Sequence, residues 1–469
     1  MKKNLLASYW NGIIEDKKGE SYGNILRYFF PEFITALILY TALSWIDSYW
    51  VAQLKSTTTY ATHGTLNNIL HAVLKFADGM MIGAMIIGGQ FYGGKKFKEV
   101  GRTFAETFWV MLTFGLIASS ILFFGSYPIL CFYNASDAMI SCGVPLMKVR
   151  ALGVLFMFVY FVFIAFLRSI KNTRTPMITF IIGGLVFLFF DYALIFGQWG
   201  FPTLGQQGSA WATVLQYGSM LISAALLVLF NPDYRKFDLN VFNYRPDFVA
   251  IKRLLTLSWP VVIDKSTMAV AYIWLGSMVT KMGEDPAASF VVIKDLERAL
   301  FLPAIAFAQV ITFLASNDFG AKNTAGIKAN IKKINLLASI FVLVILIVSI
   351  YYKEFLIGLF DRKGTFAEFS AQAFPIISIF VFFDVLQIVL SGALRGVSDV
   401  KIVMWSRIVI CVGFFAPVSY LIVKLPFGDN LLKFILIYGI FYLSNGLMSL
   451  VYVHRFRSGK WLQAEQEKI

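Results

Sequence analysis

Long apolar runs recur along this chain of 469 residues, and they restrict its fold more than any other feature does. An α-helix rises 1.5 Å per residue, so roughly twenty apolar residues cross the hydrocarbon core of a bilayer, which is about 30 Å thick. Runs of this length predict twelve spans, at residues 25–50, 65–91, 104–125, 147–169, 177–197, 209–230, 255–280, 288–316, 334–352, 373–394, 402–423 and 431–453. We therefore expect an all-α membrane protein embedded in the lipid bilayer.

The composition excludes a water-soluble domain, because 58% of the residues are apolar and only 14% are charged. A soluble core cannot hide so much apolar surface. The charged residues gather between the apolar runs and form no basic stripe, so the net charge of +14 does not predict nucleic-acid binding. The glycine-rich turns lack a phosphate-binding signature. We predict neither an enzyme nor a bound cofactor.

The basic residues predict the orientation in the membrane. One alternate set of connections holds most of the Lys and Arg, and the other holds roughly a third as many. Cytoplasmic connections retain positive charge, so both termini are predicted to be cytoplasmic in a multi-pass protein of the plasma (inner) membrane.

The sequence also contains an internal repeat. Residues 90–95 align with 317–322, and residues 166–172 align with 393–399, both at an offset of 227. Each half then holds six spans and enters and leaves on the same side, which is typical of a parallel repeat with the substrate path between two lobes. The predicted regions are a cytoplasmic N-terminal segment, an N-lobe, a cytoplasmic linker, a C-lobe and a cytoplasmic tail, at residues 1–24, 25–230, 231–253, 254–453 and 454–469.

Four short motifs resemble a known family. They are Gly93-Gly94, Gly320-Ala321, the segment GQQGSAWAT at residues 205–213 and the segment GALRG at residues 392–396. The chain looks like a member of the MATE (multidrug and toxic compound extrusion) family, of the MOP flippase superfamily. The resemblance implies a Na⁺- or H⁺-coupled antiporter that exports small organic compounds through a cleft between two pseudo-symmetric six-helix bundles. We expect a monomer.

Carboxylates inside predicted spans are candidate sites for the coupling ion, because a charge at mid-membrane costs about 2.5 to 3.5 kcal/mol or more. Asp47 resembles the family's embedded aspartate of the first span, with three hydroxyl groups on nearby turns as candidate co-ligands, those of Thr41, Ser44 and Ser48. Asp191 is similar to the aspartate of the fifth span, which shares the cation site of the N-lobe with the first. Two carboxylates in a low-dielectric pocket cannot easily both ionise, so one holds a proton or the pair binds a metal cation.

The resemblance also implies sites in the C-lobe. Asp384 stands eight residues before Gly392, as in members that use this aspartate for the cation. Those members carry an acidic residue where this chain has Met268, and Asp264 lies one turn earlier. We expect Asp264 and Asp384 to form a C-lobe site, and Na⁺ to bind at Asp47, Asp191 or Asp384 if it is the coupling ion. The family often has an Asn one turn before the aspartate of the fifth span, where this chain has Phe187 and Leu188.

Further ionisable or polar residues lie inside the spans and are candidates for a substrate cavity: His71, Lys75, Asp78, Thr213, Lys265, Lys294, Asp295, Glu297 and Arg298. Arg407 in the eleventh span is a further unexpected charge. One interpretation is that the basic residues form internal ion pairs that tie helices together. The other is that they bind an anionic or zwitterionic substrate.

We therefore predict a secondary active exporter of drugs or other organic compounds, driven by H⁺ or Na⁺ through alternating access. Two alternatives stay open: a flippase for lipid-linked saccharides, in which basic residues would hold a diphosphate, and an exporter of an anionic metabolite. The duplication favours a carrier over a channel or receptor.

Overall fold

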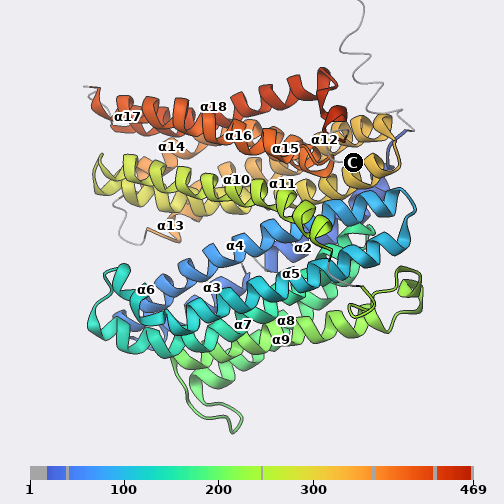
Figure 1. Ribbon diagram of the computed structural model, residues 1–469. Helices are drawn as coiled ribbons and strands as arrows, with labels where there is room; N and C mark the ends of the chain where they lie inside the picture. Colours follow the sequence, from blue (N-terminus) through green and yellow to red (C-terminus); the bar gives the residue numbers. More distant parts are fainter. Residues whose placement is uncertain (1–17, 39–41, 245–246, 362–365, 426–429, 466–469) are drawn as a thin grey trace, which may run out of the picture. The chain divides into compact units, whose positions relative to one another are not determined.

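The computed structural model describes residues 18–38, 42–244, 247–361, 366–425 and 430–465 (Figure 1). Within these residues every regular element is a helix. The first half holds eight of them: α2 (Tyr22–Leu37), α3 (Leu43–Ala52), α4 (Thr57–Gly93), α5 (Phe97–Phe124), α6 (Ser126–Phe132), α7 (Asp137–Ser169), α8 (Arg174–Phe196) and α9 (Gln206–Leu229).

A short helix, η2 (Pro232–Phe237), precedes the second half. The helices that follow are α10 (Phe248–Thr280), α11 (Glu284–Gly320), α12 (Thr324–Tyr351), α13 (Lys353–Gly358), α14 (Ala367–Ile379), α15 (Val381–Gly396), α16 (Val400–Ile410), η3 (Cys411–Phe415), α17 (Ala416–Lys424), α18 (Asn430–Arg457) and η4 (Lys460–Glu465).

Each predicted span lies in one helix or in consecutive helices. In the described residues, nine helical segments are long and apolar enough to cross a membrane, and α14 with α15, bent by 45°, makes a tenth. The first predicted span corresponds to α2 and α3, with residues 39–41 outside the described residues, and the seventh corresponds to α10. The prediction of an all-α membrane fold is confirmed.

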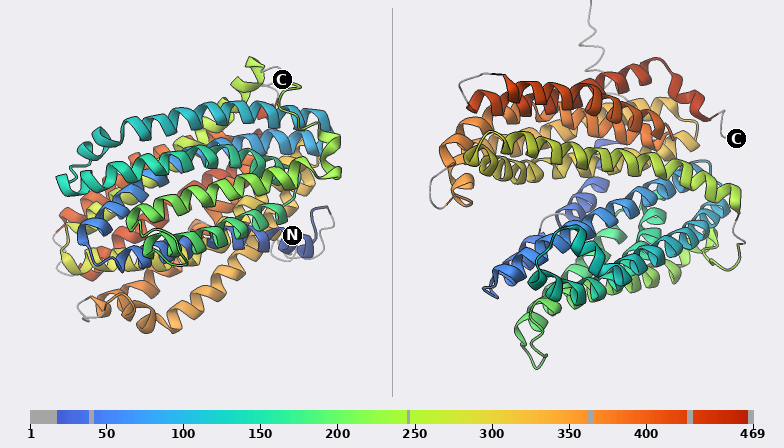
Figure 2. Two further views of the ribbon diagram at one scale, coloured as in Figure 1. Left: turned by 90° about the horizontal axis from the view of Figure 1, so that it is seen from below. Right: turned by 60° about the vertical axis from the view of Figure 1, so that its left-hand side comes forward.

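The chain divides into two compact units. Residues Phe30–Val262 form one, the N-unit, and Met1–Phe29 with Ile263–Ile469 form the other, the C-unit. In the N-unit the long helices α4, α5, α7, α8 and α9 run side by side, with α7 contacting each of the others (Figures 1 and 2). In the C-unit, α11 is the most buried span and contacts α12, α14, α15 and α18.

The predicted linker, residues 231–253, belongs to the N-unit because its side chains pack there. Phe237 is buried against Tyr92, Phe97 and Phe166. The linker backbone runs so close to α5 that a Cβ on Gly101 would lie 1.7 Å from the carbonyl oxygen of Phe237. The boundary between the units therefore falls inside α10 and not in the linker.

Candidate functional site

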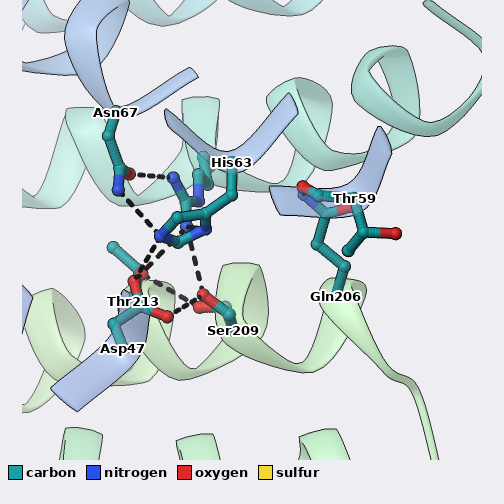
Figure 3. A network of polar contacts seen from close by, with 8 residues as sticks. Asp47, Thr59, His63, Asn67, Gln206, Ser209 and Thr213 are labelled. Atoms are coloured by element: carbon teal, nitrogen blue, oxygen red, sulfur yellow. Dashed lines mark hydrogen bonds and ion pairs between the residues drawn. The ribbon is translucent and has the colours of Figure 1, made fainter. Parts of the chain in front are cut away.

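The N-unit buries a carboxylate, Asp47 of α3, whose two oxygens both have partners. Its Oδ1 accepts a hydrogen bond from Ser209 Oγ of α9 at 2.8 Å. Its Oδ2 lies 3.4 Å from His63 Nε2 of α4 and 3.8 Å from Arg150 Nη2 of α7. Figure 3 shows Asp47, His63 and Ser209 pointing toward one another. Four helices thus converge on one carboxylate.

Arg150 is the cation of this cluster, and its side chain is only 2% exposed. Its Nη1 donates to Asn67 Oδ1 at 2.5 Å, and its Nη2 donates to Ser209 Oγ at 3.1 Å. A buried guanidinium is stable only when it is paired with a negative group and hydrogen-bonded, and Asp47 together with these two acceptors meets both conditions.

The imidazole of His63 faces a hydrogen-bond donor at each ring nitrogen. Arg150 Nη2 lies 3.5 Å from Nδ1, and Asn67 Nδ2 lies 2.9 Å from Nε2. A neutral ring with its proton on Nε2, which faces Asp47 Oδ2, can accept from Arg150 at Nδ1, whereas a protonated ring would place an N–H group against the guanidinium. The contacts therefore favour a neutral His63, which leaves Arg150 as the positive partner of Asp47.

Asp191 of α8 is the second carboxylate of the N-unit, and it is completely buried. Neither of its oxygens has a hydrogen-bond partner among the described residues. Asp47 and Arg150 are the charged groups whose fields act on it. One turn earlier, Phe187 packs in an apolar cluster with Leu43. A buried carboxylate without a hydrogen-bond partner is stable only if it holds a proton or meets a cation.

The remaining polar candidates of the N-unit contribute less to this cluster. Thr213 Oγ1 donates to the carbonyl oxygen of Ser209 on its own helix at 2.9 Å. Ser44 and Ser48 are half-buried on α3, and Thr41 lies outside the described residues. On α4, the candidates His71 and Lys75 are exposed, and Asp78 is half-buried.

Asp264 of α10 is held by two arginines in the C-unit. Arg395 Nη2 of α15 donates to its Oδ2 at 2.5 Å, and Arg407 Nε of α16 donates to its Oδ1. The expected site shared by Asp264 and Asp384 is therefore not what the structure presents, because both oxygens of Asp264 are taken by guanidinium groups. Its neighbour Lys265 is half-buried.

Two further carboxylates are buried in the C-unit. Asp384 of α15 is 1% exposed, and its Oδ2 has no partner among the described residues, with Arg407 as the cation whose field acts on it. Glu297 of α11 is 3% exposed, and its Oε1 accepts a hydrogen bond from Tyr442 of α18 at 2.5 Å. The field of Asp384 acts on Glu297. The C-unit thus also combines a carboxylate paired with arginine, Asp264, with one that has an unpartnered oxygen among the described residues, Asp384.

The basic candidates of α11 are more exposed. Arg298 lies 3.9 Å from Asp295, one turn away, and its side chain is 48% exposed. Lys294 Nζ lies 5.6 Å from the centre of the Phe290 ring, a cation–π contact. These contacts are local to one helix and do not neutralise the buried carboxylates.

Sequence reasoning missed His63, Asn67, Arg150 and Ser209. A signal was present: Arg150 lies inside the apolar run 147–169, and His63 and Asn67 are four residues apart, on one helical face. The predicted second span began at residue 65, which left His63 outside it.

A family model described as MatE matches residues 33–193 and 260–421, more than half of the chain. The second match begins 227 residues after the first (260 against 33), at the offset of the internal repeat. The duplication is therefore a property of the whole fold and not only of its motifs.

Relatives with similar sequences have multidrug resistance names. A probable multidrug resistance protein NorM of Thermotoga maritima is 25% identical over 361 residues, which cover 77% of each chain. One of Bacillus cereus is 23% identical over 406 residues, which cover 85% of this chain and 86% of the relative.

Solved structures share the fold along nearly the whole chain. The outward-facing conformation of a multidrug resistance MATE family transporter of the MOP superfamily has a TM-score of 0.86 at 15% identity, covering 94% of this chain and 96% of that one. A MOP superfamily transporter of Pyrococcus furiosus has a TM-score of 0.83 at 16% identity, covering 93% and 95%. These structures share the fold, and the duplicated match of the family model over more than half of the chain shows that the chain belongs to the MATE family of membrane transporters.

Proposed function

We propose that this chain is a secondary active antiporter, which exports small organic compounds from the cell as H⁺ or Na⁺ moves inward. The observation that carries the proposal is Asp191, a fully buried carboxylate with no hydrogen-bond partner among the described residues. Such a group is costly unless an ion neutralises it, so its neutralisation can be linked to a change of conformation. The names of the NorM relatives support organic compounds as the substrates.

Cation movement and substrate export would be coupled because the outward-facing and inward-facing states differ in their affinity for the cation and the substrate. An outward-facing state that admits a cation to the N-unit would neutralise Asp191 and release the substrate. An inward-facing state would return the cation to the cytoplasm and rebind the substrate. Because the linkage is reciprocal, bound substrate weakens cation binding by the same factor as the cation weakens substrate binding.

The same proposal includes the membrane in which the protein lies and its orientation there. The excess of Lys and Arg in alternate connections supports a multi-pass protein of the plasma (inner) membrane with both termini in the cytoplasm. We propose a monomer with no cofactor besides the coupling ion. A single cysteine introduced at exposed Asp233, in a variant lacking the three native cysteines, should react with a membrane-impermeant thiol reagent only after the cells are opened.

Transport in proteoliposomes tests the function. A panel of organic cations and zwitterions is offered under an H⁺ gradient and, separately, under a Na⁺ gradient. We expect saturable transport under at least one gradient, its loss in Asp191→Asn, and no change in the control Asp233→Asn, which alters an exposed carboxylate of η2. A flux that rises linearly with substrate concentration and depends on neither gradient would overturn the proposal.

A second candidate function is supported by the basic side chains of α11. Arg298 is half exposed, and Lys294 lies one turn before it. These cations suit an anionic metabolite or the diphosphate of a lipid-linked saccharide. The same vesicles should be tested with organic anions and with a fluorescent lipid diphosphate. Movement of these compounds alone, and of no drug, would favour this candidate.

A further inference from the structure

Na⁺ is one of the two coupling ions proposed above, and the N-unit would have to supply its ligands. A hard cation is bound by a set of oxygen atoms. Around Asp47 most oxygens are already used: Oδ1 accepts from Ser209, and Oδ2 faces His63 and Arg150. Asn67 Oδ1 accepts from Arg150. Asp47 Oδ1 and Asn67 Oδ1 thus already accept hydrogen bonds, and Asp47 Oδ2 lies beside the cation that would compete with Na⁺.

The surroundings of Asp191 do not replace these ligands. Its two oxygens have no partner among the described residues, but Phe187, one turn earlier, packs against Leu43 and Ala212 in an apolar cluster. The Thr213 hydroxyl donates to the backbone of its own helix. Two carboxylate oxygens by themselves are too few for a Na⁺ site.

The charge balance of the N-unit also favours a proton over Na⁺. Arg150 keeps its positive charge at every physiological pH and is fixed by Asn67, Ser209 and Asp47. Arg150 of α7 and His63 of α4 lie beside Asp47, the field of Arg150 also acts on Asp191, and the phenol of Tyr217 of α9 lies in the fields of Arg150 and Asp47. One fixed cation against two carboxylates leaves one negative charge. A proton neutralises it without any oxygen ligands, whereas Na⁺ would need ligands and would be repelled by Arg150.

We infer that Arg150 is a tethered counter-cation that takes the place of a metal ion beside Asp47, so that the N-unit excludes Na⁺. The inference rests on the proposed function for its role in coupling, since it leaves H⁺ as the ion that the N-unit exchanges. Arg150 acts through Asp47 and is a positioning residue that determines ion selectivity.

Sodium binding by the purified protein tests this inference without any substrate. The midpoint of thermal unfolding, Tm, is measured in sodium chloride and in choline chloride at equal ionic strength. For the wild type, and for Arg150→Lys, which keeps the charge, we expect the Tm in sodium chloride to equal the Tm in choline chloride. Arg150→Gln should gain a Na⁺-specific rise of about 2–4 °C, because a ligand that binds only the folded state stabilises it. The double variant Arg150→Gln/Asp191→Asn should lose that rise.

A saturable Na⁺-dependent rise of Tm in the wild type that Asp191→Asn abolishes would overturn the inference, whether or not the Arg150 variants fold. A folded Arg150→Gln protein without any response to Na⁺ would also overturn it. The transport assay separates the two proposals. If the wild type is driven by Na⁺ through Asp191, the proposed function stands and this inference falls. If no substrate moves but Na⁺ stabilises only Arg150→Gln, the inference stands and the proposed function falls.

Discussion

Arg168 and Glu32 form a bidentate ion pair inside the N-unit, with Nε 2.8 Å from Oε1 and Nη2 2.6 Å from Oε2. Arg168 belongs to the first copy of a repeated motif, and its counterpart 227 residues later is Arg395, which pairs with Asp264. Glu32 directly follows Pro31 of α2, and Asp264 follows Pro260 of α10 by four residues. In both repeats, the duplicated arginine therefore holds a carboxylate of the helix that carries the proline.

The Arg168 pair should contribute strongly to stability, because both side chains are at most 8% exposed. Arg168→Gln leaves Glu32 buried and uncompensated, and we expect a loss of about 3–5 kcal/mol in the free energy of unfolding. Unfolding in detergent measures it, with exposed Arg235→Gln as the control. The double variant Arg168→Gln/Glu32→Gln should lose less than the sum of the single variants. Strict additivity would show that the pair carries no coupling energy.

Asp264 should matter more than either of its arginines. Asp264→Asn removes the carboxylate that pairs with both guanidinium groups, whereas Arg395→Gln leaves Asp264 still paired with Arg407. We expect Asp264→Asn to lower the free energy of unfolding by about 3–5 kcal/mol and Arg395→Gln by less than half as much. Asp295→Asn, on the half-exposed side of α11, is the matched control. Equal losses in the two test variants would contradict the shared pairing.

Ser209 links the carboxylate and the guanidinium of the N-unit, since its hydroxyl donates to Asp47 and accepts from Arg150. Ser209→Ala removes both hydrogen bonds, and we expect a loss of about 1–3 kcal/mol in the free energy of unfolding. Thr213→Val serves as the control, because that hydroxyl donates to a backbone carbonyl of its own helix, α9. Thermal unfolding compares the two, and a greater loss in Thr213→Val would contradict the bridging role.

The linker should depend on Gly101. Alanine normally stabilises a helix by up to about 1 kcal/mol relative to glycine. At this position a Cβ would lie 1.7 Å from the carbonyl oxygen of Phe237, so Gly101→Ala must displace the linker. We expect faster cleavage by trypsin at Lys236 and a lower Tm. Gly64→Ala in α4, where no atom lies within 4 Å of the added Cβ, should show neither effect. Unchanged cleavage in Gly101→Ala would mean that the linker does not rest on α5.

Hydropathy predicted the positions of the spans but not the shape of each one. Residues 25–50 and 373–394 each read as one apolar run, yet the first corresponds to α2 and α3 and the second to α14 and α15, bent by 45°. Apolar composition reports whether a segment can lie in hydrocarbon. It does not report where the helix axis bends.

The candidate site was only partly accessible to sequence reasoning. Asp47, Asp191 and Asp384 stand out because a carboxylate inside an apolar run is expensive. Their partners do not follow from that argument: Arg150 lies 103 positions beyond Asp47 and meets it only because α3 and α7 converge (150 against 47). Asp264 was paired with Asp384 on the basis of a family pattern, and in the structure α15 and α16 each bring an arginine to it instead.

The amino-acid sequence by itself determined the membrane class, the span positions and the duplication, because each depends on local composition or on comparison of the chain with itself. Only the tertiary structure decided which buried charges meet, that Arg150 neutralises Asp47, and that Asp191 has no partner among the described residues. Those pairings depend on how helices distant in sequence are rotated and packed against one another, and no local pattern encodes that geometry.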